Sequence, residues 1–260
     1  MASKTIALVG ANGLVGKSFA NSFLDQGLDL RILARVESTE SAVLKELTSR
    51  GASVRGISYE DESSLIKALQ GVDVLVSTVS AAGLTTQLVL IKAANIAGVK
   101  LFFPSEYGNV YDHPSNEISP YLQLKKTIVN SAKELGLPYA GRCVGRRECK
   151  THMDNYTFDA NSWIANVLKS VSIEQLQNKH LRIQGDSASA NEIVKLWKRN
   201  TTKLEVVYHP TTELDERLSA DKNDILAIIL REWASGRGEI GGKDNGLYPS
   251  WKPDTVESVL

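Results

Sequence analysis

The chain has 260 residues, which is long enough for one large domain or for one domain with a smaller appendage. Thirty Lys and Arg residues balance thirty Asp and Glu residues, so the formal net charge is zero. This balance argues against the basic surface on which nucleic-acid binding depends, and we expect no nucleic-acid partner. No apolar run approaches the roughly 20 residues of a membrane span, so we expect no membrane partner either.

Two cysteines, Cys143 and Cys149, are too few for a disulfide framework and have no neighbours at metal-ligand spacing. We therefore expect no metal site. The N-terminus leads almost directly into a predicted strand and carries no signal pattern. A reducing, cytoplasmic location is the expectation.

Short apolar runs alternate with amphipathic stretches through the first half of the chain. The predicted strands are residues 5–9, 30–34, 53–57, 72–78 and 99–104. Helices are expected between them, for example over residues 14–24 and 84–97, where apolar residues recur at helical spacing. This alternation predicts a doubly wound parallel α/β sheet of the Rossmann type.

The second half has a weaker pattern. Helices are predicted over residues 161–171, 188–199 and 221–231, and strands over 180–184 and 204–209. We expect residues 1–145 to form an NAD(P)-binding Rossmann domain. Residues 146–260 are expected to form a small C-terminal α/β substrate lobe, packed on the first domain rather than independent of it.

A glycine-rich turn follows the first predicted strand and opens the first predicted helix. It consists of Gly10, Ala11, Asn12, Gly13, Leu14, Val15 and Gly16. In a dinucleotide site the first glycine allows the tight turn, the second admits the pyrophosphate and the third lets helix and strand pack closely. The helix N-terminus then presents N–H groups to the phosphates. The alternative is a turn that only joins strand to helix.

The residue after the second predicted strand selects the cofactor. An NAD site places an acid there to accept the ribose hydroxyls. Here Arg35 occupies the position, and no acid follows until Glu37. An arginine can bind the 2′-phosphate through charge-assisted hydrogen bonds, so we predict NADP (NADPH) as cofactor. A surface arginine without that role is the alternative.

Three motifs together resemble the NmrA-like and isoflavone reductase-like family, a group of atypical short-chain dehydrogenases/reductases. They are the glycine turn, Arg35 and the string Phe102-Phe103-Pro104-Ser105-Glu106-Tyr107-Gly108. The resemblance implies that the glycine turn binds the pyrophosphate and that Arg35 binds the 2′-phosphate. It also implies that the ribose and nicotinamide are lined by Thr78, Ser80, Gly83 and Gln87. Lys125, eleven residues before Gly136, matches the family's catalytic lysine, which holds the nicotinamide ribose and helps to move a proton.

Tyr121 lies one helical turn before Lys125, so both side chains are expected on one helix face. This spacing matches the acid and its helper in the wider short-chain dehydrogenase class. The alternatives are a tyrosine that packs on the core and a lysine that faces solvent. Other candidates carry less weight. We expect surface positions for His113 and His152, pocket-shaping roles for Glu106 and Tyr107, and packing roles for Trp163, Trp197, Trp233 and Trp251.

Residues 140–152 depart from the family pattern, because they are polar, basic and glycine-bearing. We predict that they do not form a buried strand, and the resemblance implies that about 30–50 residues are absent nearby. Such a loss would leave the sheet edge beyond the fifth strand poorly covered.

Taken together, the sequence predicts an NADPH-binding oxidoreductase that transfers a hydride to a small aromatic or conjugated metabolite. The alternatives are a non-catalytic NADP(H)-sensing regulator with a protein partner and a truncated, inactive relative.

Overall fold

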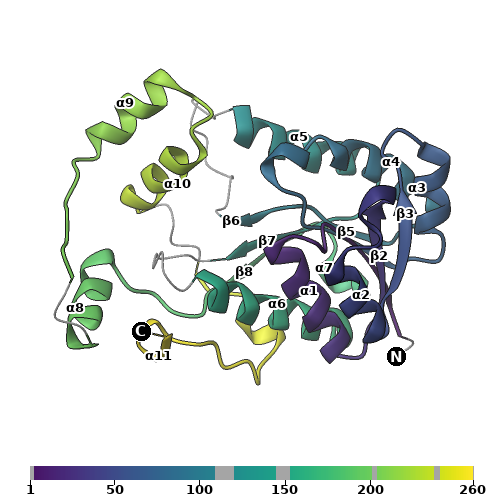
Figure 1. Cartoon of the computed structure of the whole chain (residues 1–260), viewed down its shortest axis with the longest axis horizontal. Coiled ribbons are helices and arrows are strands. Elements are labelled where there is room, and N and C mark those ends of the chain that lie inside the picture. Colours follow the sequence, from purple (N-terminus) through teal and green to yellow (C-terminus); the bar gives the residue numbers. More distant parts are fainter. Residues whose placement is uncertain (1–2, 109–119, 145–152, 201–203, 237–240, 260) are drawn as a thin grey trace.

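The computed structural model describes residues 3–108, 120–144, 153–200, 204–236 and 241–259. At its centre lies a parallel sheet with helices on both faces (Figure 1). Five strands follow the order β3-β2-β1-β4-β5, and every neighbouring pair is parallel. Their bounds are Thr5–Val9 (β1), Asp29–Arg35 (β2), Ser53–Ile57 (β3), Val74–Ser77 (β4) and Leu101–Phe103 (β5). This confirms the predicted doubly wound α/β fold.

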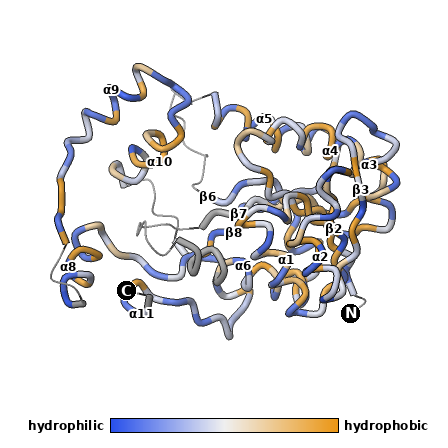
Figure 2. The backbone as a smooth tube through the Cα atoms, in the orientation of Figure 1, coloured by the Kyte–Doolittle hydropathy of each residue, from blue (hydrophilic) through white to orange (hydrophobic). Residues whose placement is uncertain are grey.

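Helices cover the two faces because successive strand residues point to opposite sides. Ile6 and Leu8 of β1 lie in one apolar cluster, whereas Ala7 and Val9 lie in the other. The helices and 3-10 turns of this half are α1 (Leu14–Asp25), η1 (Val36–Ser38), α2 (Ala42–Ser49), α3 (Glu62–Leu69), η2 (Ala81–Gly83), α4 (Thr86–Ala97) and α5 (Pro120–Glu134). Figure 2 shows hydrophobic segments concentrated in the strands and in the helices beside them.

The sheet continues beyond β5. Phe102 forms a parallel bridge with Tyr139, and its N–H donates to the carbonyl of Pro138 at 2.8 Å. A further parallel set follows in the order β6-β7-β8, with bounds Tyr107–Gly108, Ala140–Val144 and Lys179–Ile183. The prediction that residues 140–152 form no buried strand is therefore wrong for 140–144. Small residues make the strand possible, since a Cβ on Gly141 would lie 2.5 Å from His180 Nδ1.

The outer edge of β8 is also covered, contrary to the expectation of an exposed sheet edge. The Arg182 N–H donates to the Asp244 carboxylate at 2.7 Å, and the Asp244 N–H returns a bond to the Arg182 carbonyl at 3.1 Å. The Asn245 amide accepts from the Gln184 N–H at 3.1 Å and donates to the Gln184 carbonyl at 2.8 Å. These two residues take the place of a neighbouring strand, which blocks the edge against pairing with another chain.

The C-terminal half contributes to the same core. Its elements are α6 (Met153–Ser170), α7 (Ile173–Leu176), α8 (Ala190–Asn200), α9 (Thr212–Ala220), α10 (Ile225–Ala234), η3 (Asn245–Leu247) and α11 (Val256–Val259). Helix α6 packs on α1, where the buried Asn161 amide donates to Ser18 Oγ at 2.8 Å. Trp163 of α6 is fully buried in the cluster that holds Ile6. The first half and α6 thus share one hydrophobic core.

Helices α8, α9 and α10 lie away from the sheet, on the left of Figure 1. The predicted strand over residues 204–209 is wrong for this chain, because these residues join α8 to α9 without pairing in a described sheet. Helix α9 was not predicted, since its sequence is mostly polar. None of the described helices combines the length and the hydrophobicity that crossing a bilayer requires.

Candidate functional site

The glycine turn joins β1 to α1 with the geometry that a phosphate site needs. Gly10 has a φ of +90°, a left-handed conformation that favours glycine. Its carbonyl accepts the Gly13 N–H at 2.9 Å, which closes the turn. Gly13 is the N-cap of α1 in an extended conformation and supplies no side-chain cap. The first N–H groups of α1 therefore have no capping side chain and suit an anion.

Close packing under the turn explains why two of its residues are glycines. A Cβ on Gly16 would lie 2.1 Å from the carbonyl oxygen of Gly10, and a Cβ on Gly10 would lie 2.6 Å from Thr78 Oγ1. The Thr78 hydroxyl donates to the Val9 carbonyl at 2.7 Å. Thr78, predicted to line the cofactor, thus supports the turn from below. Leu14, which opens α1, is 57 % exposed at the mouth of the turn.

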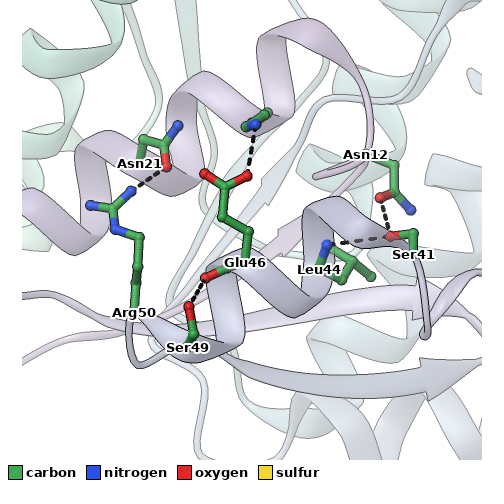
Figure 3. Close-up of polar contacts among 8 residues, drawn as sticks. Asn12, Asn21, Ser41, Leu44, Glu46, Ser49 and Arg50 are labelled. Carbon is green, nitrogen blue, oxygen red and sulfur yellow. Dashed lines mark hydrogen bonds and ion pairs between the residues drawn. The ribbon is translucent and has the colours of Figure 1, made fainter.

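Asn12 links the glycine turn to the second helix of the fold. Its Oδ1 accepts a 2.7 Å hydrogen bond from Ser41 Oγ, which also caps α2 by accepting the Leu44 N–H at 3.3 Å (Figure 3). Farther along, the ammonium of Lys17 in α1 lies 2.9 Å from the Glu46 carboxylate of α2. Helices α1 and α2 are consequently linked twice, once through Asn12 and Ser41 and once through Lys17 and Glu46.

Arg35 ends β2 beside the turn, where the sequence places it. Its side chain is 63 % exposed, and its Nε lies 3.3 Å from the Glu37 carboxylate. An exposed pair of this kind contributes little to stability, so the guanidinium can exchange Glu37 for a phosphate at low cost. Burial raises the pKa of Tyr59, while a hydrogen bond with Thr86 and the charge of Arg35 act in the opposite direction.

The connection from β4 to α4 carries Ser80 and Gly83, and Gln87 lies in the first turn of α4. Ser80 is exposed and begins the 3-10 turn η2, and its carbonyl accepts the Gly83 N–H at 2.9 Å. Gln87 is buried, and its Oε1 accepts the Ser105 N–H at 2.8 Å. The Ser105 hydroxyl donates to the Val79 carbonyl at 2.8 Å. Gln87 therefore holds the loop after β5 against the loop after β4, a role for Ser105 that the sequence did not indicate.

Glu106 ends the same loop, and Tyr107 begins β6. The Tyr107 hydroxyl donates to the Ser77 carbonyl at the end of β4, and its ring lies 5.4 Å from the ring of Phe19 in α1. Glu106 is buried, with Oε2 about 3.0 Å from where a Gly141 Cβ would lie. Glu106 is thus buried and Tyr107 partly buried near the carboxyl ends of β4 and β5, where open α/β sheets bind ligands.

Lys125 and Tyr121 lie on one face of α5, as the spacing predicts. Lys125 is only 6 % exposed, which excludes the solvent-facing alternative. Its ammonium sits 5.0 Å from the centre of the Tyr121 ring, a cation–π arrangement. The contact is with the face of the ring. A buried ammonium is costly to maintain without favourable partners, and the Tyr121 ring is one such partner.

Several predicted features lie elsewhere or cannot be placed. His113, Cys149 and His152 fall outside the described residues, and Cys143 lies in β7. Trp163 and Trp251 pack edge to face with ring centres 6.4 Å apart, in keeping with the packing role predicted for them.

Known proteins are similar to this chain in sequence and in fold. Residues 2–157 match the NmrA-like family. Phenylcoumaran benzylic ether reductase PT1 of Pinus taeda is 30 % identical, over 98 % of this chain and 97 % of its own length. Phenylcoumaran benzylic ether reductase IRL1 of Ginkgo biloba is 29 % identical, over 100 % of this chain and 99 % of its own length.

Solved structures agree on the fold. A complex of AtPrR2 with NADP+ and (+)pinoresinol has a TM-score of 0.83 at 21 % identity, and covers 99 % of this chain and 97 % of that one. The complex of leucoanthocyanidin reductase with NADPH from Vitis vinifera has a TM-score of 0.79 at 22 % identity, and covers 97 % of each chain.

The sequence comparisons also show that this chain is shorter than its relatives. The alignments with the pine and ginkgo reductases each run over 304 positions, whereas this chain has 260 residues. The difference is at least 44 internal positions at which the relatives have residues and this chain has none. This number agrees with the expected absence of about 30–50 residues. The match over residues 2–157 and the 30 % identity with the pine reductase place the chain in the NmrA-like family.

Proposed function

We propose that this protein is an NADPH-dependent reductase that transfers a hydride to a small aromatic or conjugated metabolite. The observation that carries the proposal is the glycine turn at the uncapped N-terminus of α1 with Arg35 beside it. Support comes from the relatives, which are named as phenylcoumaran benzylic ether reductases and share 29–30 % of their residues with this chain.

The site fits the cofactor in shape and charge. Gly10 and Gly16 leave no space for a Cβ beneath the turn, so α1 begins directly against the end of β1 and its first N–H groups are held in a fixed place. Arg35 supplies the positive charge that a 2′-phosphate requires, and its side chain is 63 % exposed at the end of β2. We assign the pyrophosphate to residues 10–16 and the 2′-phosphate to Arg35.

The reaction needs a hydride and a proton. Bound NADPH supplies the hydride, and the protein supplies orientation and the proton. In our proposal the buried ammonium of Lys125 holds the nicotinamide ribose and delivers the proton that balances hydride addition to the substrate. Tyr121 keeps that ammonium in place through the face of its ring. Ser80, Gly83 and the loop held by Gln87 line the nicotinamide side.

The second candidate is an NADP(H)-sensing regulator without catalysis. The deficit of at least 44 residues favours it, because a missing stretch would remove part of a substrate wall while leaving the glycine turn intact. Lys125 favours the enzyme, since sensing has no need for a buried proton donor. We propose the cytoplasm as the location and a small molecule as the partner, in keeping with the reductase.

Turnover separates the two candidates. Purified protein with NADPH should oxidise the cofactor in the presence of conjugated carbonyls or phenylpropanoid ethers. Lys125→Ala should lower that rate by at least about a hundredfold, while the NADPH dissociation constant changes by less than about tenfold. Lys126→Ala, at the neighbouring position, is the matched control and should retain the rate. Tight NADPH binding without turnover on any substrate would favour the sensor.

A further inference from the structure

The segment of residues 204–209 connects α8 to α9 along the outer left side of the molecule in Figure 1. Figure 2 shows hydrophobic residues within it. Its sequence, Leu204-Glu205-Val206-Val207-Tyr208-His209, is rich in the β-branched and aromatic residues that favour strands. The fold nevertheless includes it in none of the described sheets.

This segment is held at its end but has no strand partner. The Tyr208 hydroxyl donates to Asn191 Oδ1 at 3.1 Å, and His209 Nδ1 lies 2.9 Å from the Glu213 carboxylate. Among the described residues, no backbone group of 204–209 bonds to another strand. Val207 is 64 % exposed and Tyr208 is 74 % exposed. Within the described part of the chain the segment thus has an unpaired backbone, in contrast to β8, whose edge is covered.

A second copy of the same segment is the partner that its sequence fits. Two antiparallel copies related by a two-fold axis at Val207 place Glu205 opposite His209, an acceptor opposite a donor. The same register places Val206 opposite Tyr208, a β-branched residue opposite an aromatic one. A register shifted by one residue, with the axis between Val206 and Val207, would place Glu205 opposite Tyr208 and lose this complementarity.

We propose that two molecules of this protein associate through residues 204–209, paired as antiparallel strands about a two-fold axis at Val207. Self-pairing gives hydrogen-bond partners to the backbone N–H and C=O groups of residues 204–209. It also agrees with the strand preference of their sequence. It is independent of the proposed reductase activity.

Cysteine cross-linking tests both the partner and the register. Residues directly opposite in an antiparallel pair have Cα atoms about 4.5–5.5 Å apart, within reach of a disulfide. Val207→Cys should form a covalent dimer under mild oxidation. Val206→Cys, the matched control, places the new thiol opposite Tyr208 and should not. Equal cross-linking of both variants and the wild-type chain would overturn the register.

Sedimentation velocity on the full chain tests the association itself. The wild-type protein should show a reversible dimer, and Val207→Pro should raise its dissociation constant by at least about tenfold because proline removes a pairing N–H. Glu205→Lys should weaken the dimer, whereas Glu216→Lys, the same charge change on exposed α9, should not. Unchanged NADPH binding shows that the variants fold. A wild-type chain that stays monomeric at about 100 μM, or a Val207→Pro dimer of equal strength, overturns the proposal.

Discussion

The carbonyl oxygen of Gly10 lies where a Cβ on Gly16 would have to be, at a separation of only 2.1 Å. The first turn of α1 is therefore packed directly onto the backbone of the glycine turn. Any side chain at position 16 would push the helix away from the turn and displace the N–H groups that we assign to the pyrophosphate.

Gly16→Ala should accordingly weaken NADPH binding by at least about tenfold and lower the free energy of unfolding by about 1–3 kcal/mol. Calorimetric titration and urea unfolding measure the two effects. Gly246→Ala is the control, because its Cβ would meet nothing within 4 Å. If both variants bind NADPH like the wild type, the turn does not hold the pyrophosphate.

Glu37 competes with a 2′-phosphate for Arg35, since its carboxylate lies 3.3 Å from Arg35 Nε. Glu37→Gln should therefore tighten NADPH binding by about 2–5-fold at low ionic strength and leave NADH binding unchanged. Glu134→Gln removes the same charge at the exposed end of α5 and serves as the control. An equal gain for both cofactors would show that Glu37 acts on general charge rather than on the 2′-phosphate.

Asp73 joins the start of β1 to the start of β5. Partial burial would raise its pKa, but hydrogen bonds from Lys100 Nζ at 2.7 Å and the Thr5 N–H at 2.9 Å hold the pKa below its usual 3.8. A lowered pKa means that the ionised form stabilises the fold above pH 4, and that this stabilisation is lost as the pH falls below it.

Asp73→Asn should thus lower the Tm at pH 7, and the difference from wild type should shrink as the pH falls toward about 3. Lys100→Met should flatten the pH dependence of the Tm in the same way, because it removes the stronger of the two hydrogen-bond donors to the Asp73 carboxylate. A Tm difference that is constant between pH 7 and pH 3 would refute the stated role of the carboxylate.

Asn245 protects the edge of β8 through its two bonds to Gln184. Asn245→Ala leaves both backbone groups of Gln184 unpaired and should lower the free energy of unfolding by about 1–3 kcal/mol. Hydrogen exchange at the Gln184 amide should accelerate as well. Asn223→Ala, at an exposed position, should change stability by less than about 0.5 kcal/mol. Equal effects would mean that the edge is protected by something else.

The sequence predicted the first five strands well because β1, β4 and β5 are buried almost throughout and are therefore short apolar runs. Strand β3, at the edge of the sheet, was predicted from its sequence although Arg55 and Gly56 are exposed. It failed at Ala140–Val144, where small residues let the strand lie close to His180 and the apolar signal is lost. It also failed at residues 204–209, whose strand preference is clear but whose pairing partner is not in the described sheets. Pairing between distant segments does not appear in local composition.

Part of the candidate site could likewise be predicted from the sequence, and part could not. The glycine turn, Arg35 and the Tyr121–Lys125 face follow from local spacing, and the structure places the first two at the carboxyl ends of β1 and β2. The link from Gln87 to Ser105 depends on how two loops meet, 18 residues apart in sequence, and no local pattern indicates it. Thr78 is likewise placed by the fold, since its hydroxyl is directed to Val9 rather than outward.

The most direct test of the central claim is a calorimetric comparison of NADPH and NADH binding to the wild-type chain and to Arg35→Ala. The account predicts that the wild type binds NADPH at least about fivefold more tightly than NADH, and that Arg35→Ala removes most of this preference. Arg55→Ala, an exposed arginine on the neighbouring strand β3, should keep the preference. Equal affinity of the wild type for the two cofactors, or binding of neither, would contradict the assignment.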